Sequence, residues 1–268
     1  MRFKLILEVD KNAFGNVLPI NYQYEQSAAI YKLLSKSNTQ YSQWLHDNGF
    51  QLENGKCFKL FTFSRFKIEK REVLQQEERI IILSDTIEWQ ISFLPEKSTG
   101  NFIQGIFSNE IFQIGDKKSV VQFRIKSIEA LQMPEFKSEM IFESMSPICI
   151  RSNSQDGKID YISPLDFRAK GAILVGLMSR YQAFYNKPYQ GDLNFDFSVL
   201  TEPKSVLIKM KSDTPAQTKV RGYMCRFKIK VSAELMRIMY ESGIGEETAQ
   251  GFGCVREVKI KKVPQISL

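Results

Sequence analysis

The sequence predicts an α+β protein built from two consecutive ferredoxin-like domains, each with the RRM-like order βαββαβ. Two observations support this fold class. Segments with the periodicity of strands and helices follow one another in that order within residues 1–131, and the same order begins again within residues 139–268. The looser segment QMPEFKSE, at 132–139, separates the two halves. Because this fold supports many unrelated activities, the function must be argued from particular residues.

The first half begins with its clearest strand, RFKLILEVD at 2–10. Its odd-numbered residues from Phe3 to Val9 are apolar and share one face. Arg2 and Lys4 are expected on the opposite, polar face. The other elements expected in this half are a helix at 24–36, a short helix that ends near 49, strands at 56–68 and 79–94, a helix at 99–108 and a strand at 119–131.

In the strand at 56–68 of the first half, Phe61 and Phe63 are expected in the core, because the segment lacks the glycine pattern of an RNA-recognition strand.

The second half repeats this order with a longer first helix. The elements expected in the second half are a strand at 140–151, a helix at 168–186, strands at 193–200, 204–211 and 220–231, a helix at 232–242 and a strand at 251–262.

The composition is that of a globular protein, with 43% hydrophobic and 25% charged residues among 268. An excess of 37 Lys and Arg over 30 Asp and Glu mildly favours a polyanionic partner. The four cysteines form no C-x-x-C pair, which argues against structural zinc. The longest apolar run, at 171–178, is far shorter than a bilayer span. We therefore expect a soluble cytoplasmic protein with no membrane partner, no metal and no cofactor.

Glycines are concentrated in GIGEETAQGFGCV, at 243–255, between the last helix and the last strand. Gly243 stands where a glycine often ends a helix. Gly245, Gly251 and Gly253 flank a loop in which missing side chains would expose backbone N–H groups to phosphate oxygens. The order is wrong for a dinucleotide fingerprint, and no Gly-Lys-Ser/Thr follows as in a Walker loop.

The pattern G-x-G-x5-G-F-G before the last strand resembles that of CRISPR-associated endoribonucleases, which cut repeat transcripts into guide RNAs and belong to the repeat-associated mysterious protein superfamily. The segment YSQWLHDNGFQLENGKCFKLFTFSRF, at 41–66, resembles that family's Leu-His before a polar turn and an aromatic-rich strand. The resemblance spans essentially the whole chain. It implies precursor and mature CRISPR repeat RNA as partners, and it leaves open effector-complex subunits and a homodimer.

His46 is the single histidine in the chain. A Ser-His-Asp triad or a two-histidine metal site would therefore have to use this residue or be absent. RNA can be cut without metal when its 2′-OH attacks the adjacent phosphate and a titratable group protonates the leaving 5′-oxygen. The helix end and Asp47 both favour a protonated ring, so we expect His46 to be the general acid. The alternative is a surface histidine at a helix end. The resemblance implies products with 2′,3′-cyclic phosphate and 5′-hydroxyl ends.

The resemblance also implies a tyrosine and a lysine beside the histidine. Tyr31, at the edge of the apolar stripe of its helix, is the candidate to order the 2′-OH, with packing as an equal alternative. For the cation we favour Lys56, in the turn before the strand, over Lys59.

Basic side chains near the loop and on one hairpin are candidates for phosphate contacts. Arg226, Lys228 and Lys230 alternate along one strand and would project from one face. An ordinary solvated face is the alternative. The RNA-binding residues expected from the sequence are Gly243, Gly245, Gly251, Phe252, Gly253, Lys219, Arg221, Arg151, Arg226 and Lys228. The rival functions are a non-catalytic RNA-binding subunit of a CRISPR effector complex and an assembly protein whose glycines serve turns only.

Overall fold

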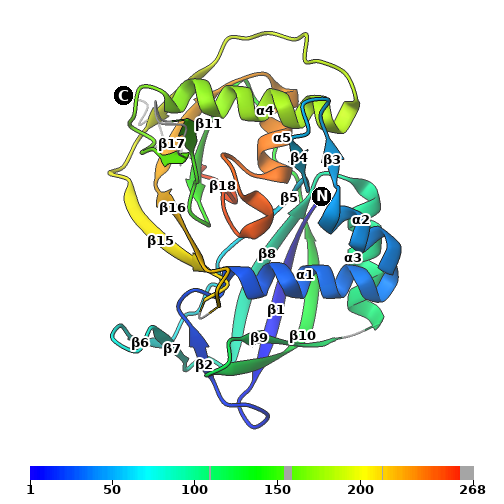
Figure 1. The fold of residues 1–268 in the computed structure, drawn as a ribbon, viewed down its shortest axis with the longest axis vertical. Helices are drawn as coiled ribbons and strands as arrows, with labels where there is room; N and C mark the ends of the chain where they lie inside the picture. Colours follow the sequence, from blue (N-terminus) through cyan, green and yellow to red (C-terminus); the bar gives the residue numbers. More distant parts are fainter. Residues whose placement is uncertain (109, 154–158, 213, 260–268) are drawn as a thin grey trace, which may run out of the picture.

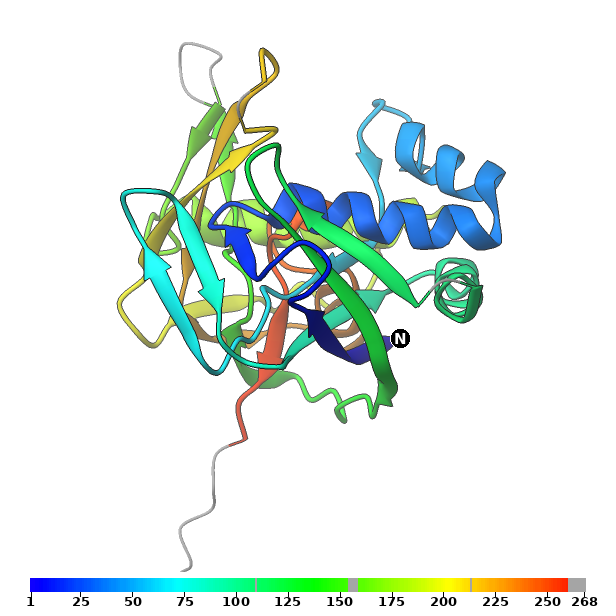
Figure 2. The ribbon, with the colours of Figure 1, turned by 90° about the horizontal axis from the view of Figure 1, so that it is seen from below.

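A five-stranded antiparallel sheet forms the frame of the first half, in a computed structural model that describes residues 1–108, 110–153, 159–212 and 214–259 (Figures 1 and 2). The strand order is β5-β8-β1-β10-β9. Without the edge strand β9, the chain runs β1-α1-β5-β8-α3-β10, which is the ferredoxin-like βαββαβ path. The elements are β1 (Arg2–Asp10), α1 (Gln23–Ser37), β5 (Phe61–Phe63), β8 (Thr86–Phe93), α3 (Glu96–Ser108), β9 (Ile111–Gly115) and β10 (Val120–Leu131).

The second half repeats this topology in a four-stranded antiparallel sheet of order β14-β17-β11-β18. The chain follows β11-α4-β14-β17-α5-β18, so each strand takes the place of its counterpart in the first sheet. The elements are β11 (Glu139–Ser144), α4 (Ala169–Tyr185), β14 (Asp196–Val199), β17 (Arg226–Lys230), α5 (Ala233–Ser242) and β18 (Val255–Glu257). The predicted α+β class with tandem ferredoxin-like folds is confirmed. We propose that the two sheets mark domains 1–131 and 139–268, although residues 260–268 lie outside the described ranges.

Small elements decorate both sheets. A three-stranded sheet of order β2-β7-β6 and three hairpins, β3-β4, β12-β13 and β15-β16, surround the frame. Their bounds, with those of α2 and the short 3₁₀-helix η1, are β2 (Val17–Pro19), α2 (Thr39–Asp47), β3 (Phe50–Gln51), β4 (Cys57–Phe58), β6 (Arg71–Leu74), β7 (Arg79–Ile82), β12 (Arg151–Asn153), β13 (Ile159–Tyr161), β15 (Lys204–Met210), β16 (Thr218–Met224) and η1 (Thr248–Gln250). Within the described ranges, no helix combines the length and apolar character needed to cross a bilayer.

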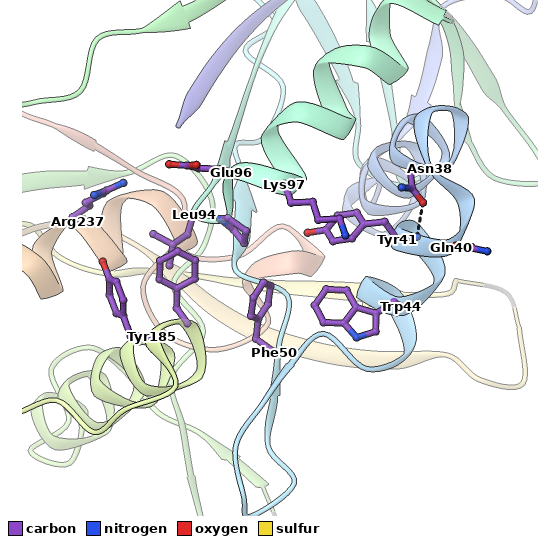
Figure 3. A pocket seen from close by; sticks show the side chains of 12 residues that line it. Asn38, Gln40, Tyr41, Trp44, Phe50, Leu94, Glu96, Lys97, Tyr185 and Arg237 are labelled. Atoms are coloured by element: carbon purple, nitrogen blue, oxygen red, sulfur yellow. Dashed lines mark hydrogen bonds between the residues drawn. The ribbon is translucent and has the colours of Figure 1, made fainter.

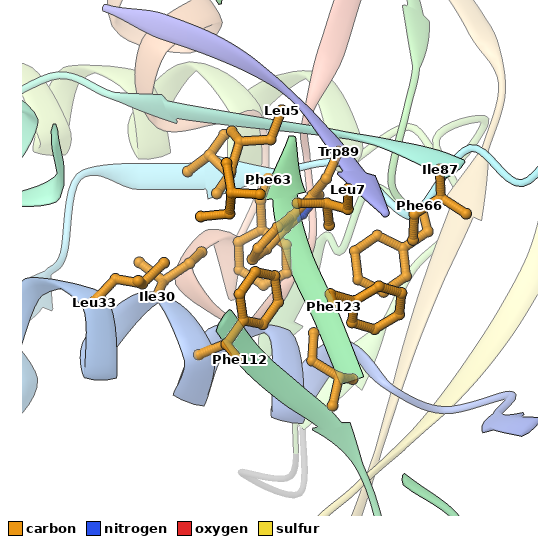
Figure 4. Packing of buried hydrophobic residues seen from close by; sticks show 14 of the residues in the cluster. Leu5, Leu7, Ile30, Leu33, Phe63, Phe66, Ile87, Trp89, Phe112 and Phe123 are labelled. Atoms are coloured by element: carbon orange, nitrogen blue, oxygen red, sulfur yellow. The ribbon is translucent and has the colours of Figure 1, made fainter. Parts of the chain in front are cut away.

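The core of the first half lies between its sheet and α1 (Figure 4). Leu5 and Leu7 on β1 and Ile30 on α1 are fully buried, as the alternation of the strand and the stripe of the helix predict. The prediction that Phe61 and Phe63 are core residues is confirmed, since both are 0% exposed.

Arg2 departs from the alternation of β1. It was expected on a polar face but is 1% exposed. Its guanidinium lies 3.7 Å from the ring centre of Tyr240, and it donates hydrogen bonds to the main-chain oxygens of Tyr240 and Val255. The residue therefore joins the first sheet to the second half, a contact that the pattern within one strand cannot reveal.

Three predicted strands are each broken in the structure. Residues 56–68 divide into β4, which pairs with β3, and β5, which joins the first sheet. Residues 220–231 were expected as one strand, but the ladder changes at Cys225: β16 pairs with β15, and β17 joins the second sheet. Residues 79–94 divide into β7 and β8 between 82 and 86, because β7 belongs to the three-stranded sheet. Strands β2, β6 and β9 were not predicted, because short edge strands carry little periodicity.

Glu25, on the first turn of α1, leads to a test of stability against pH. Burial raises the pKa of its carboxyl from 4.5 to about 7, with a further contribution from Asp116. Because the folded-state pKa lies above the unfolded value, folding takes up a proton at pH values between the two, from 4.5 to about 7. The stability that the protonated Glu25 provides is therefore lost as the pH rises through this window. We expect Glu25→Gln to remove this loss and to raise the free energy of unfolding by roughly 1–2 kcal/mol at slightly alkaline pH. Urea unfolding at pH values below and above this window measures the change in the free energy of unfolding, with the exposed Glu53→Gln as control.

Candidate functional site

His46 lies in the last turn of α2, and local interactions define both ends of this helix. The side-chain oxygen of Asn38 accepts a hydrogen bond from the Tyr41 N–H at 2.9 Å, which caps the first turn. Gly49, with φ of 63°, ends the helix, and its N–H donates to the Trp44 carbonyl at 2.9 Å. The imidazole is 67% exposed, and its Nδ1 lies 2.8 Å from Asp47 Oδ1. The helix thus presents an accessible imidazole beside a carboxylate.

Tyr31 lies next to His46. The two rings meet edge to face with 5.1 Å between their centres. Burial raises the pKa of the Tyr31 hydroxyl, with smaller contributions from Tyr41 and Asp47, so the phenol keeps its proton near neutral pH. Both residues line a pocket of about 390 Å³ between α1 and α2. The two residues chosen from the sequence therefore share one pocket.

The glycine-rich loop contacts the same helix, α1 (Figure 1). Ser27, another residue of the pocket, donates a hydrogen bond from its hydroxyl to the Ala249 carbonyl at 2.7 Å. Ser27 precedes Tyr31 by one helical turn, so both side chains lie on the same side of α1. The loop and His46 therefore lie on the same side of the molecule, connected through one face of α1.

Lys56 and Lys59 have different contacts. The Lys56 ammonium pairs with Glu246 of the glycine-rich loop at 2.8 Å. Lys59 donates to the main-chain oxygen of His46 at 2.6 Å, and burial lowers the pKa of its ammonium. Lys59, which the sequence analysis ranked second, is thus the lysine bound at the end of α2. Lys56 instead joins the β3-β4 hairpin to the loop.

The glycines of the loop have a structural cause that differs from the expected one. A Cβ at Gly245 would lie 2.2 Å from the Cys149 oxygen, and one at Gly253 would lie 2.0 Å from the Ile244 oxygen. A Cβ at Gly251 would instead meet side-chain carbons, at 2.9 Å on Phe63 and 3.0 Å on Gln23. All have positive φ. At Gly245 and Gly253, backbone oxygens of the chain itself occupy the space that a side chain would need.

The expectation of exposed N–H groups at this loop is also wrong in part. The Gly253 N–H donates to the Pro147 oxygen at 2.8 Å, and that of Gly251 to the Thr248 oxygen at 3.3 Å. Phe252 is 0% exposed and packs in a small core cluster with Cys149, Ile208, Met210 and Val220. Its ring is therefore closed to a ligand here and supports the loop from within.

Three cations bind residues 245–247 of the loop, and the sequence analysis singled out only two of them. Besides Lys56, Arg151 pairs with Glu247. Arg180 on α4, 2% exposed, donates to the Gly245 oxygen. An arginine that follows the apolar run 171–178 within the helix predicted at 168–186 is a signal that could have been noticed.

Comparisons with known proteins show which family the chain belongs to. The family model described as CRISPR-associated protein Cas6, N-terminal, matches residues 17–126, and the one described as CRISPR associated protein Cas6, C-terminal, matches residues 131–257. The CRISPR-associated endoribonuclease Cas6 1 of Methanocaldococcus jannaschii is 30% identical, over 97% of this chain and 94% of the relative. The chain belongs to the Cas6 family.

Two solved structures show the same architecture over the whole chain. One, from the characterization of a Cas6-related gene of Pyrococcus furiosus, is 27% identical with a TM-score of 0.81, covering 97% of this chain and 98% of that one. The other, an RAMP protein binding different RNA substrates, is 26% identical with a TM-score of 0.80, covering 97% of this chain and 100% of that one.

In this Cas6 family member, the predicted basic hairpin is β15-β16. Lys219 and Arg221 are exposed on β16, and Arg221 donates to the Ser205 hydroxyl at 2.7 Å. Lys219 stands directly opposite Lys209 in the ladder, and the Lys209 ammonium pairs with Glu78. The hairpin therefore carries cations near its tip.

The cations on β17 face acidic partners. Arg226 pairs with Glu143 at 3.1 Å, and Lys228 pairs with Glu139 at 3.4 Å. Both carboxylates come from the neighbouring strand β11 of the Cas6 fold. The predicted common face exists, but its charge is partly neutralised by the protein itself.

The sequence analysis missed a basic groove of about 450 Å³ between the two halves of the Cas6 fold. Its cations are Arg65, Lys67, Arg71 and Arg256, with Glu143 among them. The alternation of basic and apolar residues in SRFKI, at 64–68, is a signal that could have found it.

Proposed function

We propose that this protein is an endoribonuclease that cuts CRISPR precursor RNA within its repeats, without a metal ion. The observation that carries the proposal is the pairing of His46 with Tyr31 in a pocket on the same side of the molecule as the glycine-rich loop. The relative from M. jannaschii is named an endoribonuclease. The products would have 2′,3′-cyclic phosphate and 5′-hydroxyl ends.

In the proposed reaction the 2′-hydroxyl gives its proton to solvent water and its oxygen bonds to phosphorus, as the bond from phosphorus to the 5′-oxygen breaks. His46 donates a proton to the departing 5′-oxygen. Its exposure lets an RNA strand reach it, and Asp47 orients the ring through Nδ1. Tyr31 stays protonated, because burial raises its pKa, so it acts by hydrogen bonding to the 2′-OH rather than as a base.

For the cation at the phosphate we propose Lys56, which an incoming phosphate would draw from Glu246. Lys59 would then hold the end of α2 through the His46 carbonyl. We expect Lys56→Met to slow single-turnover cleavage about 10- to 100-fold with RNA affinity nearly unchanged. Lys59→Met should act mainly on stability, measured by thermal unfolding. If Lys59→Met slows cleavage and Lys56→Met does not, Lys59 rather than Lys56 is the cation at the phosphate.

The RNA-binding surface proposed here joins the loop, the hairpin and the groove. Gly243, Gly245, Gly251, Phe252 and Gly253 would shape the loop beside the cut, with Phe252 acting from the core. The proposed phosphate contacts are Lys219, Arg221, Arg151, Arg226 and Lys228, together with the cations of the groove. Assembly with effector-complex subunits, formation of a homodimer and a cytoplasmic location remain proposals of the same kind.

The test is incubation of the purified protein with a repeat-containing transcript in EDTA. Unit-length products ending in cyclic phosphate, formed by the wild type and not by His46→Ala, are the expected result. A protein that binds the repeat tightly but cuts no transcript would support the rival function, a non-catalytic RNA-binding subunit.

A further inference from the structure

A second pocket, of about 810 Å³, lies across α2 from the one that contains His46 (Figure 3). Trp44 lines this pocket, and His46 follows it by two positions. Residues so spaced point about 200° apart around a helix. One helix therefore separates the proposed cleavage site from the second pocket. The other walls come from β3, α3, α4 and α5, so the pocket lies between the two halves of the protein.

Five aromatic side chains line this pocket. Trp44 meets Phe50 edge to face with 5.3 Å between ring centres, and Tyr41 lies 5.5 Å from Trp44. From the second half, the ring of Phe184 on α4 lies 6.2 Å from that of Phe50 between ring centres, and Tyr185 lines the same pocket. Trp44 is 37% exposed and Tyr185 is 40% exposed, so these rings are open to a ligand rather than closed in a core. Such a cluster in a cavity is typical of a binding site.

The pocket also holds its rings in place. The Tyr41 hydroxyl lies 2.5 Å from the Ser98 hydroxyl on α3, and the Tyr41 N–H is bound by Asn38. These contacts keep the Tyr41 ring beside Trp44. An ordered aromatic surface loses little conformational entropy when a flat ligand stacks on it.

Charges at the rim favour an anionic ligand. The Lys97 ammonium lies 5.0 Å from the ring centre of Tyr41, and Arg237 lines the pocket from α5. Glu96 is the opposing carboxylate at the rim, and Glu241 already pairs with Arg237. Lys97 is thus the cation best placed for a phosphate, at the beginning of α3, where the helix dipole also attracts anions. Rings beside a cation fit a nucleotide better than an apolar peptide side chain.

We propose that this pocket binds the base of one unpaired nucleotide of the RNA, whose strand passes around the end of α2 from the phosphate at His46. The proposal rests on the proposed function and names a contact for its substrate. The base stacks on Trp44, and Lys97 contacts the adjoining phosphate. Stacking tolerates any base, so the pocket fixes the position of the strand rather than its sequence.

The test uses the His46→Ala protein, so that the repeat RNA stays intact whether or not the wild type cleaves it. One base at a time is removed from the RNA to give a set of abasic strands. We expect one abasic position to weaken binding about tenfold in the parent. When Trp44→Leu is added to the His46→Ala parent protein, this abasic strand should bind as tightly as intact RNA does. When Trp44→Phe is added instead, the abasic strand should again bind about tenfold more weakly than intact RNA.

Tryptophan fluorescence gives a second readout, because Trp89 is fully buried and Trp44 is the exposed one of the two. Intact RNA should quench the emission of Trp44, and the abasic strand of the sensitive position should not. The proposal is overturned if every abasic strand loses affinity equally in Trp44→Leu and in the parent. It is also overturned if adenosine monophosphate quenches Trp44 and repeat RNA does not, or if no RNA quenches it, which would leave the pocket to a protein partner.

Discussion

Replacing His46 with Ala is expected to slow cleavage of repeat RNA by about 10²–10⁴-fold, the range in which one general acid contributes to a reaction. The structure offers no second histidine to take its place, because His46 is the only one in the chain. Single-turnover kinetics with excess enzyme would measure the effect on the chemical step alone.

RNA binding and stability should hardly change in this variant. The imidazole is 67% exposed, and it contacts the side chains of Asp47 and Tyr31. Exposed side chains of this kind contribute within about 0.5 kcal/mol to stability. The matched control is Gln43→Ala, an exposed side chain of the same pocket. Equal cleavage by His46→Ala and the control would refute a catalytic role for His46.

Gly253→Ala is expected to have a large effect on stability. Its Cβ would lie 2.0 Å from the Ile244 oxygen, far inside contact distance, and φ is +71°. The backbone must move, and the hydrogen bond from Ile244 N–H to the Gly253 oxygen, at 2.9 Å, is lost with it. We expect the free energy of unfolding to fall by about 3 kcal/mol or more, which lowers Tm by roughly 10 °C.

Gly55→Ala separates the crowding from the strain of positive φ. Gly55 has φ of +81° in the β3-β4 turn, but nothing lies within 4 Å of the Cβ position. Only the left-handed conformation is penalised there, by about 1 kcal/mol. Calorimetry of the two variants compares them directly. If Gly253→Ala melts at the same temperature as Gly55→Ala, close packing is not what requires glycine in the loop.

Patterns along one segment gave reliable predictions of the elements that depend on that segment alone. The strand expected at 2–10 is β1, and the helix expected at 24–36 differs from α1 by one residue at each end. The break at Cys225 was invisible, because β-type alternation continues on both sides while the partner strand changes. Periodicity reports which residues face a core, not which sheet supplies the neighbour.

The site shows the same limit. The sequence singles out His46 by its uniqueness and Tyr31 through resemblance, but their contact depends on how α1 packs against α2. The excess of glycine identified the loop correctly as special, yet the atoms that approach it belong to Cys149 and Ile244. Arg180 was missed because its partner, the Gly245 oxygen, lies on a distant segment.

The central claim is that His46 protonates the leaving 5′-oxygen, and an RNA with sulfur in place of that oxygen at the cut tests it most directly. A thiolate leaves readily without a proton, so this substrate does not need a general acid. The account predicts that His46→Ala cuts the sulfur-containing RNA nearly as fast as the wild type does, while remaining slow on ordinary RNA. An equally large defect on both substrates would contradict the claim.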